Sequence, residues 1–521
     1  MSEMSIPNGP GQAARDGLAS PPDPRRWLIL GVVGLAQLMV ILDATIVNIA
    51  LPSAQRALHF STVDRQWVVT AYALAFGSLL LFGGRLADLL GRKVTFLVGI
   101  TGFAVASAVG GAATSFTMLA VARACQGACG ALMAPAALSV LTVTFTDPKE
   151  RGKAFGVFGA IAGAGGAVGL LLGGVLTEYL SWRWCLYVNL VFAAVSGVGA
   201  SMLLRRQASS DRPRLDIPGV LAVSGGMFCI VYGFANAATH NWHTPSTWGF
   251  LAVGVALLAV FAWWQTRAPA PLLPLRIILD RNRGAAYLSI LIAGSGIFGI
   301  FLFLTYYMQL TLRFSPVVTG VAFLPMVGCI MVSANLATIV LMPRVGPRPL
   351  VTCGMLIAGG AMVWLTRIGI HSSYATDVLP ALLLAGIGLG QTVAPSINTG
   401  TFGVAPTDAG VASASVNTGQ QLGGSIGTAL LNTIATGAVT SYLASHVFHG
   451  FGPPGDLRAL ALVHGYTTAF WWSAAIFAFG AVVAGSLFRW GPLTRQGATR
   501  QPGAIPQDSQ QVAAPPVPER P

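Results

Sequence analysis

The chain of 521 residues is 54% hydrophobic and only 9% charged, whereas soluble domains are about 25% charged. This composition excludes an ordinary soluble protein and predicts that the chain folds within a lipid bilayer. The net charge of +13 would fit a protein that binds nucleic acid, but the placement of the basic residues, described below, argues against that class.

Polar ends enclose a long apolar region. Residues 1–26 lack the basic stretch and short apolar core of a cleaved signal peptide, so we expect a disordered cytoplasmic N-terminus. Residues 490–521 are rich in Gln, Pro and Ala and are expected to form a disordered cytoplasmic tail. Between them we expect fourteen membrane-spanning helices, at residues 27–50, 66–84, 94–114, 117–140, 154–178, 184–204, 217–236, 247–266, 285–309, 317–341, 349–366, 378–400, 410–441 and 468–488.

The basic residues lie mostly on one side of these spans. An even number of spans places both termini on the same side. With the termini inside, 23 of the 30 lysines and arginines fall in cytoplasmic segments and six in outer loops, and Arg123 lies within a span. The positive-inside rule therefore predicts cytoplasmic termini in the plasma membrane. It also explains the basic charge without a nucleic-acid partner.

A weak internal repeat divides the chain. LLGRKVTFLVG at 89–99 resembles PRVGPRPLVTCG at 343–354, and each follows the second span of its half. We expect an all-α fold of two six-helix bundles, at 27–204 and 285–489. Residues 205–284 would form a linker that carries two inserted transmembrane helices. Parallel repeats of this kind are typical of transporters.

No motif for an enzyme or an ATPase is present. The chain has no G-x-x-x-x-G-K-[ST], H-E-x-x-H or G-x-S-x-G sequence. Cys125 and Cys129 are spaced as a ligand pair, but no nearby histidine or acid completes a metal site. We therefore expect no catalytic residue, no metal and no cofactor, and any uphill transport would draw its energy from an ion gradient.

Asp43 is the only one of the 17 acids that lies in the middle of a span. A charge at the centre of a membrane helix costs about 2.5–3.5 kcal/mol on insertion scales, which makes such a residue a candidate for function. Arg123 is the only basic residue within a span. Each lies seven residues from the outer end of its span, a depth of roughly 10 Å at the helical rise. The matching depth makes an electrostatic pairing feasible, either directly or through water, and the pair would serve either proton coupling or merely helix packing.

Proton coupling would use simple chemistry. Burial raises the pKa of a carboxyl group, and a neighbouring guanidinium lowers it. A conformational change that alters this contact would let Asp43 load a proton outside and release it inside. Gln126, three residues after Arg123, lies on the same helix face.

Two other constellations are candidates for conformational roles. GRLADLLGRK (84–93) contains Gly84, Asp88, Gly91, Arg92 and Lys93, which form either a positive-inside anchor or a latch that stabilises one arrangement of the bundles. The span at 154–178 is rich in glycines spaced by four, which serve close helix packing or a sliding surface. Its candidate helix-packing residues are Gly165, Gly169, Gly173 and Gly174.

Several polar residues are candidates to line a substrate cavity. With Asp43 as the one central acid, we expect a lipophilic substrate that is neutral or singly charged rather than a dication. Packing is the competing role for most of these polar residues. The candidates are Gln126, Tyr306, Gln309, Gln391, Asn398 and Asn417.

These stretches together resemble the major facilitator superfamily, specifically its fourteen-helix drug/proton antiporters of the QacA/EmrB type. The resemblance covers residues 27–490. It is carried by LDATIVNIALP, QWVVTAYALAFGSLLLFGGRLADLLGRK, ARACQGACGALMAP, LSWRWCLYVNL, FLTYYMQL, GVAFLP and DAGVASASVNTGQQLGGSIGTAL. It implies two bundles around a central cavity, alternating access and export of hydrophobic compounds or antibiotics in exchange for protons. It also implies roles for Asp43, Asp88, Arg92 and Arg123.

The chain departs from the family pattern at two positions, where Leu170 and Val191 replace prolines. Because proline kinks helices, the exchange direction and substrate range stay open. A transporter of the same fold for uptake or lipid movement is one alternative, and a membrane scaffold or sensor is another. We expect a monomer whose partners are protons, a lipophilic small molecule and the bilayer.

Overall fold

The computed structural model describes residues 24–145, 148–204, 216–240, 242, 244–269, 271–273, 275–404, 409–447 and 454–492. Secondary structure in these residues is helical throughout. The expected all-α membrane architecture is confirmed: twelve described helical stretches are long and apolar enough to cross a bilayer, and α2 and α5 hold two shorter apolar stretches, Trp67–Leu80 and Val168–Tyr179.

Every expected span lies on its own long helix. The first six are α1 (Arg26–Leu58), α2 (Thr62–Leu90), α3 (Arg92–Gly111), α4 (Phe116–Thr144), α5 (Pro148–Tyr179) and α6 (Trp184–Leu203). The inserted region holds α7 (Ile217–His240), α8 (Pro245–Gln265) and the short α9 (Leu275–Ile278). The rest are α10 (Arg281–Tyr306) with the π-helix η1 (Tyr307–Thr311), α11 (Pro316–Asn335) with η2 (Leu336–Leu341) and α12 (Met342–Val345), α13 (Pro347–Leu365), η3 (Tyr374–Val378) with α14 (Leu379–Thr401), α15 (Ala409–Val447) and α16 (Pro454–Leu487).

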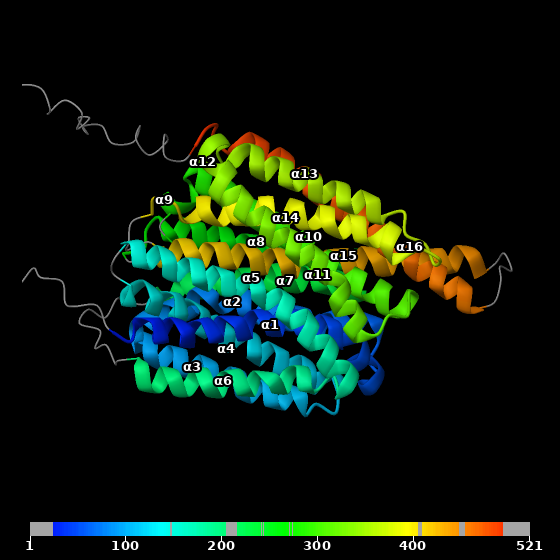
Figure 1. The fold of residues 1–521 in the computed structure, drawn as a ribbon, viewed down its shortest axis with the longest axis horizontal. Coiled ribbons are helices and arrows are strands. Elements are labelled where there is room, and N and C mark those ends of the chain that lie inside the picture. Colours follow the sequence, from blue (N-terminus) through cyan, green and yellow to red (C-terminus); the bar gives the residue numbers. More distant parts are fainter. Residues whose placement is uncertain are drawn as a thin grey trace, which may run out of the picture.

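The helices run roughly parallel to one long axis (Figure 1). We call the end where α1 begins at Arg26 and α16 is followed by Gly491 the terminal face, and the opposite end the distal face. Serine caps begin three helices at the distal face. Ser61, Ser115 and Ser315 each accept a hydrogen bond from the backbone N–H three residues later, which satisfies a donor that the first helical turn leaves free.

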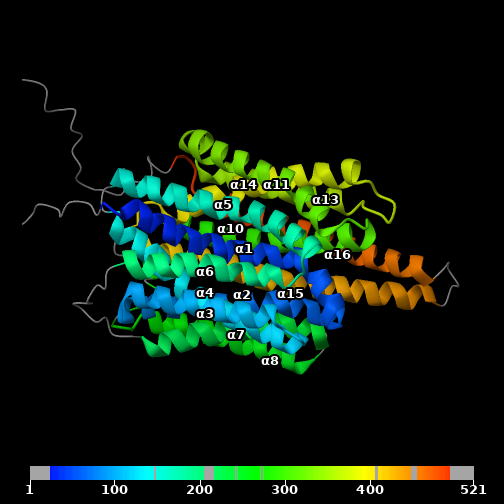
Figure 2. The same cartoon turned by 60° about the horizontal axis from the view of Figure 1, so that its bottom comes forward.

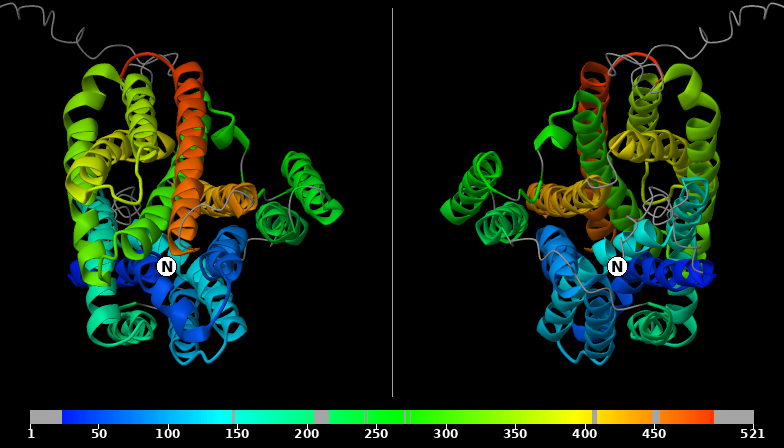
Figure 3. Two further views of the ribbon diagram at one scale, coloured as in Figure 1. Left: turned by 90° about the vertical axis from the view of Figure 1, so that its right-hand side faces the viewer. Right: turned by 90° about the vertical axis from the view of Figure 1, so that its left-hand side faces the viewer.

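Helices α1–α6 pack mainly on one another, and so do α10–α16. In the first group α1 lies between α5 and α6 (Figure 2). The two groups meet along two seams, α5 against α11 and α2 against α15. The α7–α8 hairpin stands beside the second seam, where α7 packs on both α2 and α15 (Figure 3).

Candidate functional site: a buried ion pair at the centre of the first helix group

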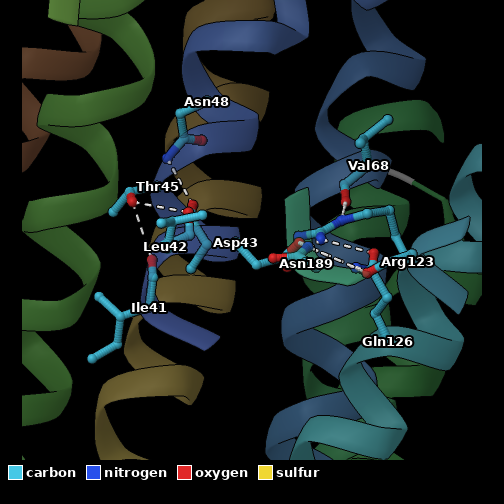
Figure 4. Close-up of polar contacts among 11 residues, drawn as sticks. Ile41, Leu42, Asp43, Thr45, Asn48, Val68, Arg123, Gln126 and Asn189 are labelled. Carbon is cyan, nitrogen blue, oxygen red and sulfur yellow. Dashed lines mark hydrogen bonds and ion pairs between the residues drawn. The ribbon is translucent and has the colours of Figure 1, made fainter. Parts of the chain in front are cut away.

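The structure brings Asp43 of α1 and Arg123 of α4 into direct contact (Figure 4). Arg123 Nη1 donates to Asp43 Oδ2 over 2.5 Å, and the two residues are 1% and 0% exposed. Because Asp43 is fully buried, its carboxylate depends on donors from the protein. The sequence predicted both the pairing and the partner from their equal depth, whereas the proton-coupling role stays a prediction.

Amide and hydroxyl groups complete the surroundings of the carboxylate. Asp43 Oδ1 accepts from Gln126 Nε2 at 3.1 Å and from Asn189 Nδ2 at 2.8 Å. Both amides also donate to Ser107 Oγ, at 2.6 and 3.2 Å respectively. We call these five residues, Asp43, Ser107, Arg123, Gln126 and Asn189, the Asp43 network. It joins α1, α3, α4 and α6.

Arg123 is held on every side. Its Nε donates to the carbonyl of Val68 at 3.2 Å, and Nη1 also donates to Gln126 Oε1 at 3.0 Å. Its guanidinium lies 4.4 Å from the ring centroid of Tyr72 on α2. A buried ion pair often contributes little net stability by itself, so stability alone does not account for this density of partners.

The sequence analysis did not predict the positions of three members of the network. Gln126, a candidate for the substrate cavity, is fully buried and bonded within the network in this conformation. Ser107 and Asn189 were not selected from the sequence, although Asn189 lies in the LSWRWCLYVNL stretch. A polar residue inside a span was the one available signal, and it does not say which helices meet.

The loop candidates lie at the terminal face. Gly91 separates α2 from α3 with φ of 88°, a left-handed conformation that favours glycine. Lys93 Nζ donates to the carbonyl of Ser201 on α6 at 2.6 Å. A Cβ on Gly84 would make ordinary contact with Pro135 at 3.6 Å. The side chain of Asp88 lies outside the described residues, so the latch role suggested for this loop stays a prediction.

The glycines of α5 face two different helices. A Cβ added at Gly169 or Gly173 would collide with Thr45 or Ile46 of α1, and one at Gly165 would make a tight contact with Leu38 and Ile41 of the same helix. A Cβ on Gly174 would lie 2.7 Å from the carbonyl oxygen of Pro316, on α11. The same helix therefore packs closely against its own group and against the other one.

The remaining cavity candidates are spread over three helices. Tyr306 is buried, Gln391 and Asn417 are half-buried, and Asn398 is exposed. Gln309 donates to the carbonyl of Ile49 at 3.2 Å and so bridges to α1.

One arginine was misplaced by the charge count. Arg65, assigned to an outer loop, is only 4% exposed and belongs to α2. Its guanidinium lies 3.3 Å from the ring centroid of Tyr306 on α10, and Nη1 donates to Gln55 at 3.1 Å. At the same face Glu178 of α5 accepts from the backbone N–H of Val317 at 3.0 Å. The two helix groups are thus joined by polar contacts at the distal face.

No metal site emerges among the described residues, where no group of three or more His, Cys, Asp or Glu side chains could hold an ion.

Known proteins that resemble this chain are named for antibiotic resistance, for export or for transport. The chain is 49% identical over 465 residues to the puromycin resistance protein pur8 of Streptomyces alboniger, covering 89% of this chain and 91% of that protein. It is 38% identical to the cephamycin export protein CmcT of Amycolatopsis lactamdurans, covering 80% and 87% of the two chains. An auto-inhibited POT family peptide transporter of known structure has the same fold, with a TM-score of 0.63 at 15% identity over 90% of this chain and 98% of that one.

A family model adds the decisive match. The model of the Major Facilitator Superfamily matches residues 33–428, a region that contains the whole Asp43 network. The chain is accordingly a multi-pass membrane transport protein and not an enzyme. The expected resemblance is confirmed, and the chain belongs to the Major Facilitator Superfamily.

Proposed function

We propose that this protein exports lipophilic antibiotics across a bacterial plasma membrane in exchange for protons, with Asp43 as the group that carries the proton. The observation that carries the proposal is the Asp43–Arg123 pair, which is buried in the bilayer-spanning part and has both carboxylate oxygens bonded. Inserting an acid at that position into the bilayer costs free energy, so such a residue is expected to have a functional role.

The exchange follows from the contacts of the pair. In the proposed cycle, helix movement separates Asp43 from Arg123, and Asp43 takes up a proton in place of its contact with the guanidinium. Alternating access then requires that the two helix groups open at opposite faces in turn. The polar contacts at the distal face, made by Arg65, Glu178 and Gln309, would be the ones that break and reform.

The similar proteins suggest the class of substrate. Besides the puromycin and cephamycin proteins, a tetracenomycin C resistance and export protein of Streptomyces glaucescens is 35% identical over 83% of this chain. We infer a lipophilic compound with at most one positive charge, because Asp43 is the one acid expected at mid-span. The basic residues assign both termini to the cytoplasm, and we propose that the protein works as a monomer.

Transport in proteoliposomes tests the proposal. A pH gradient is imposed, and proton flux and movement of puromycin, a cephamycin and tetracenomycin C are recorded together. At least one compound should move against its gradient while protons move the opposite way. Substrate and protons moving in the same direction would favour an uptake transporter, and flux without protons would contradict the proposal.

The isosteric variant Asp43→Asn should insert normally but lose gradient-driven transport. Asp64→Asn is the matched control, because Asp64 accepts a hydrogen bond from the hydroxyl of the N-cap residue Ser61 at the distal face and lies outside the network. Full coupled transport in Asp43→Asn would end the proposed role of this carboxyl group.

A further inference from the structure

A small pocket adjoins the Asp43 network on its distal side. Helices α1, α4 and α6 contribute most of its wall, and Arg123 lines its inner end. The other lining side chains are apolar apart from the thiol of Cys185 and the indole N–H of Trp182. The space has room for about one water molecule.

The spacing of residues along three helices places this pocket next to the ion pair. Val47 lies four residues after Asp43 on α1, and Leu119 lies four residues before Arg123 on α4. On α6 the pocket residue Cys185 lies four residues before Asn189. Each helix therefore places a pocket residue one turn, about 5.4 Å, closer to the distal face than its residue in the network.

The residues that line the pocket are buried in this conformation. None of its lining residues is more than 6% exposed. Trp182, in the turn between α5 and α6, lies at its distal end beside Ala54, close to the end of α1.

Arg183 holds the side chain of Trp182 in place. Its guanidinium lies 4.7 Å from the ring centroid of Trp182, and Nη1 donates to the carbonyls of Gly111 and Ala113 at 2.8 and 2.6 Å. The indole is thereby tied to the turn between α3 and α4. A movement of α6 against α3 would shift Trp182.

We propose that this pocket is the route by which water, and with it protons, reaches the Asp43–Arg123 pair from the distal face, and that Trp182 closes the route. The inference rests on the proposed function, since it supplies the path for the proton that Asp43 carries. Apolar walls hold water weakly, so a small widening wets such a passage and a small narrowing empties it. The charged or titratable side chains that face Asp43 in the described residues are Arg123, Tyr72 of α2 and Cys185 of α6.

Cys185 allows a test that needs no transport. The other five cysteines are changed to alanine, and this variant is used only if it still transports, which shows that it is correctly folded. A permanently charged methanethiosulfonate that does not cross the bilayer, 2-(trimethylammonium)ethyl methanethiosulfonate, is added from the distal side. We expect slow modification of Cys185 that becomes several-fold faster in Trp182→Ala and returns toward the original rate in Trp182→Phe. If Cys185 never reacts in any of the three while it reacts after denaturation, the pocket is not an aqueous route.

Filling the pocket tests its link to protons. Ala54→Leu adds bulk at the distal end without touching the network, and should cut proton flux and coupled transport several-fold while substrate binding is unchanged. Ala194→Leu, on the exposed face of α6, is the matched control and should leave both unchanged. If the new leucine side chain fills the pocket in Ala54→Leu and proton flux is still undiminished, the inference is overturned.

The two proposals fail separately. An unreactive Cys185 and full flux in Ala54→Leu would remove this route and leave coupling by Asp43 standing. Normal coupling in Asp43→Asn would remove the proposed function, while the dependence of Cys185 modification on Trp182 would be unaffected.

Discussion

Arg65 and Tyr306 join the two helix groups through a buried cation–π contact, in which a guanidinium from α2 lies 3.3 Å from the centre of an aromatic ring on α10. Both residues are almost inaccessible to water, at 4% and 1% exposure. A desolvated contact of this type contributes up to about 2 kcal/mol. It is well placed to set the balance between conformations with the distal face shut and open.

Removing the ring should open the distal face. Tyr306→Leu loses the aromatic ring. The equilibrium constant between closed and open conformations should then shift toward the open one by up to roughly 30-fold, the equivalent of about 2 kcal/mol. Spin labels on the distal ends of α2 and α11 would measure the distance distribution. Tyr306→Phe keeps the ring and should behave like the unchanged protein. An unaltered distribution in Tyr306→Leu would show that the contact does not control closure.

Close approach of α5 and α11 should be needed for transport. A Cβ at Gly174 would lie 2.7 and 2.8 Å from backbone atoms of Pro316 and Val317, which can yield only if a whole helix shifts. Gly174→Val should therefore cost about 1–3 kcal/mol of stability, the usual range for overpacking, and should strongly slow transport.

Gly166 provides the control on the same helix, because a Cβ there meets nothing within 4 Å. Gly166→Val should leave transport and the midpoint of thermal unfolding nearly unchanged. Equal effects of the two substitutions would point to a general sensitivity of α5 rather than to its contact with α11.

The ion pair should behave as a coupled unit in a double-mutant cycle. Arg123→Gln leaves a buried carboxylate without its partner, which typically destabilises a protein by about 3–5 kcal/mol. Adding Asp43→Asn removes the orphaned charge and should recover much of that loss. Unfolding in detergent measures all four corners of the cycle. Additive effects of the two substitutions would contradict a direct pairing.

Asp216 should hold the inserted hairpin together. It precedes α7, is 8% exposed, and accepts from Trp264 Nε1 at 2.6 Å, Gln265 Nε2 at 2.9 Å and the N–H of Gly219 at 3.0 Å. Hydrogen bonds to a charged group contribute about 1.5–3 kcal/mol each. Asp216→Ala should loosen the ends of α7 and α8, seen as faster amide hydrogen exchange there. Unchanged exchange would contradict this role, and exchange in α1 and α4 serves as the internal control.

The pattern of hydrophobic residues alone was enough to predict most of the helices. A run of apolar residues must form a helix in lipid, since every backbone group has to be bonded within the segment, and each of the fourteen expected spans lies on a helix. The ends of α15 and α16 were harder to place. These helices extend well beyond the apolar runs at 410–441 and 468–488, because helical bonding continues into polar sequence.

The site was predictable only in its charged part. Asp43 and Arg123 stand out because a charge inside a span has a high energy and needs a partner. Ser107 and Asn189 are neutral, and their role depends on how α3 and α6 are rotated against α1, which side-chain packing decides. Arg65 was misread for a related reason: its position near a helix end suggests solvent, but the facing Tyr306 comes from a distant segment.

The α7–α8 hairpin makes the two flanks of the transporter unequal toward the surrounding lipid. It stands as a two-helix screen beside the meeting line of α2 and α15. The opposite line, where α5 and α11 touch through Gly174 and Gly320, has no comparable screen among the described helices. We therefore expect a compound dissolved in the acyl chains to approach sideways along the α5–α11 flank, because the inserted pair of helices covers the other one.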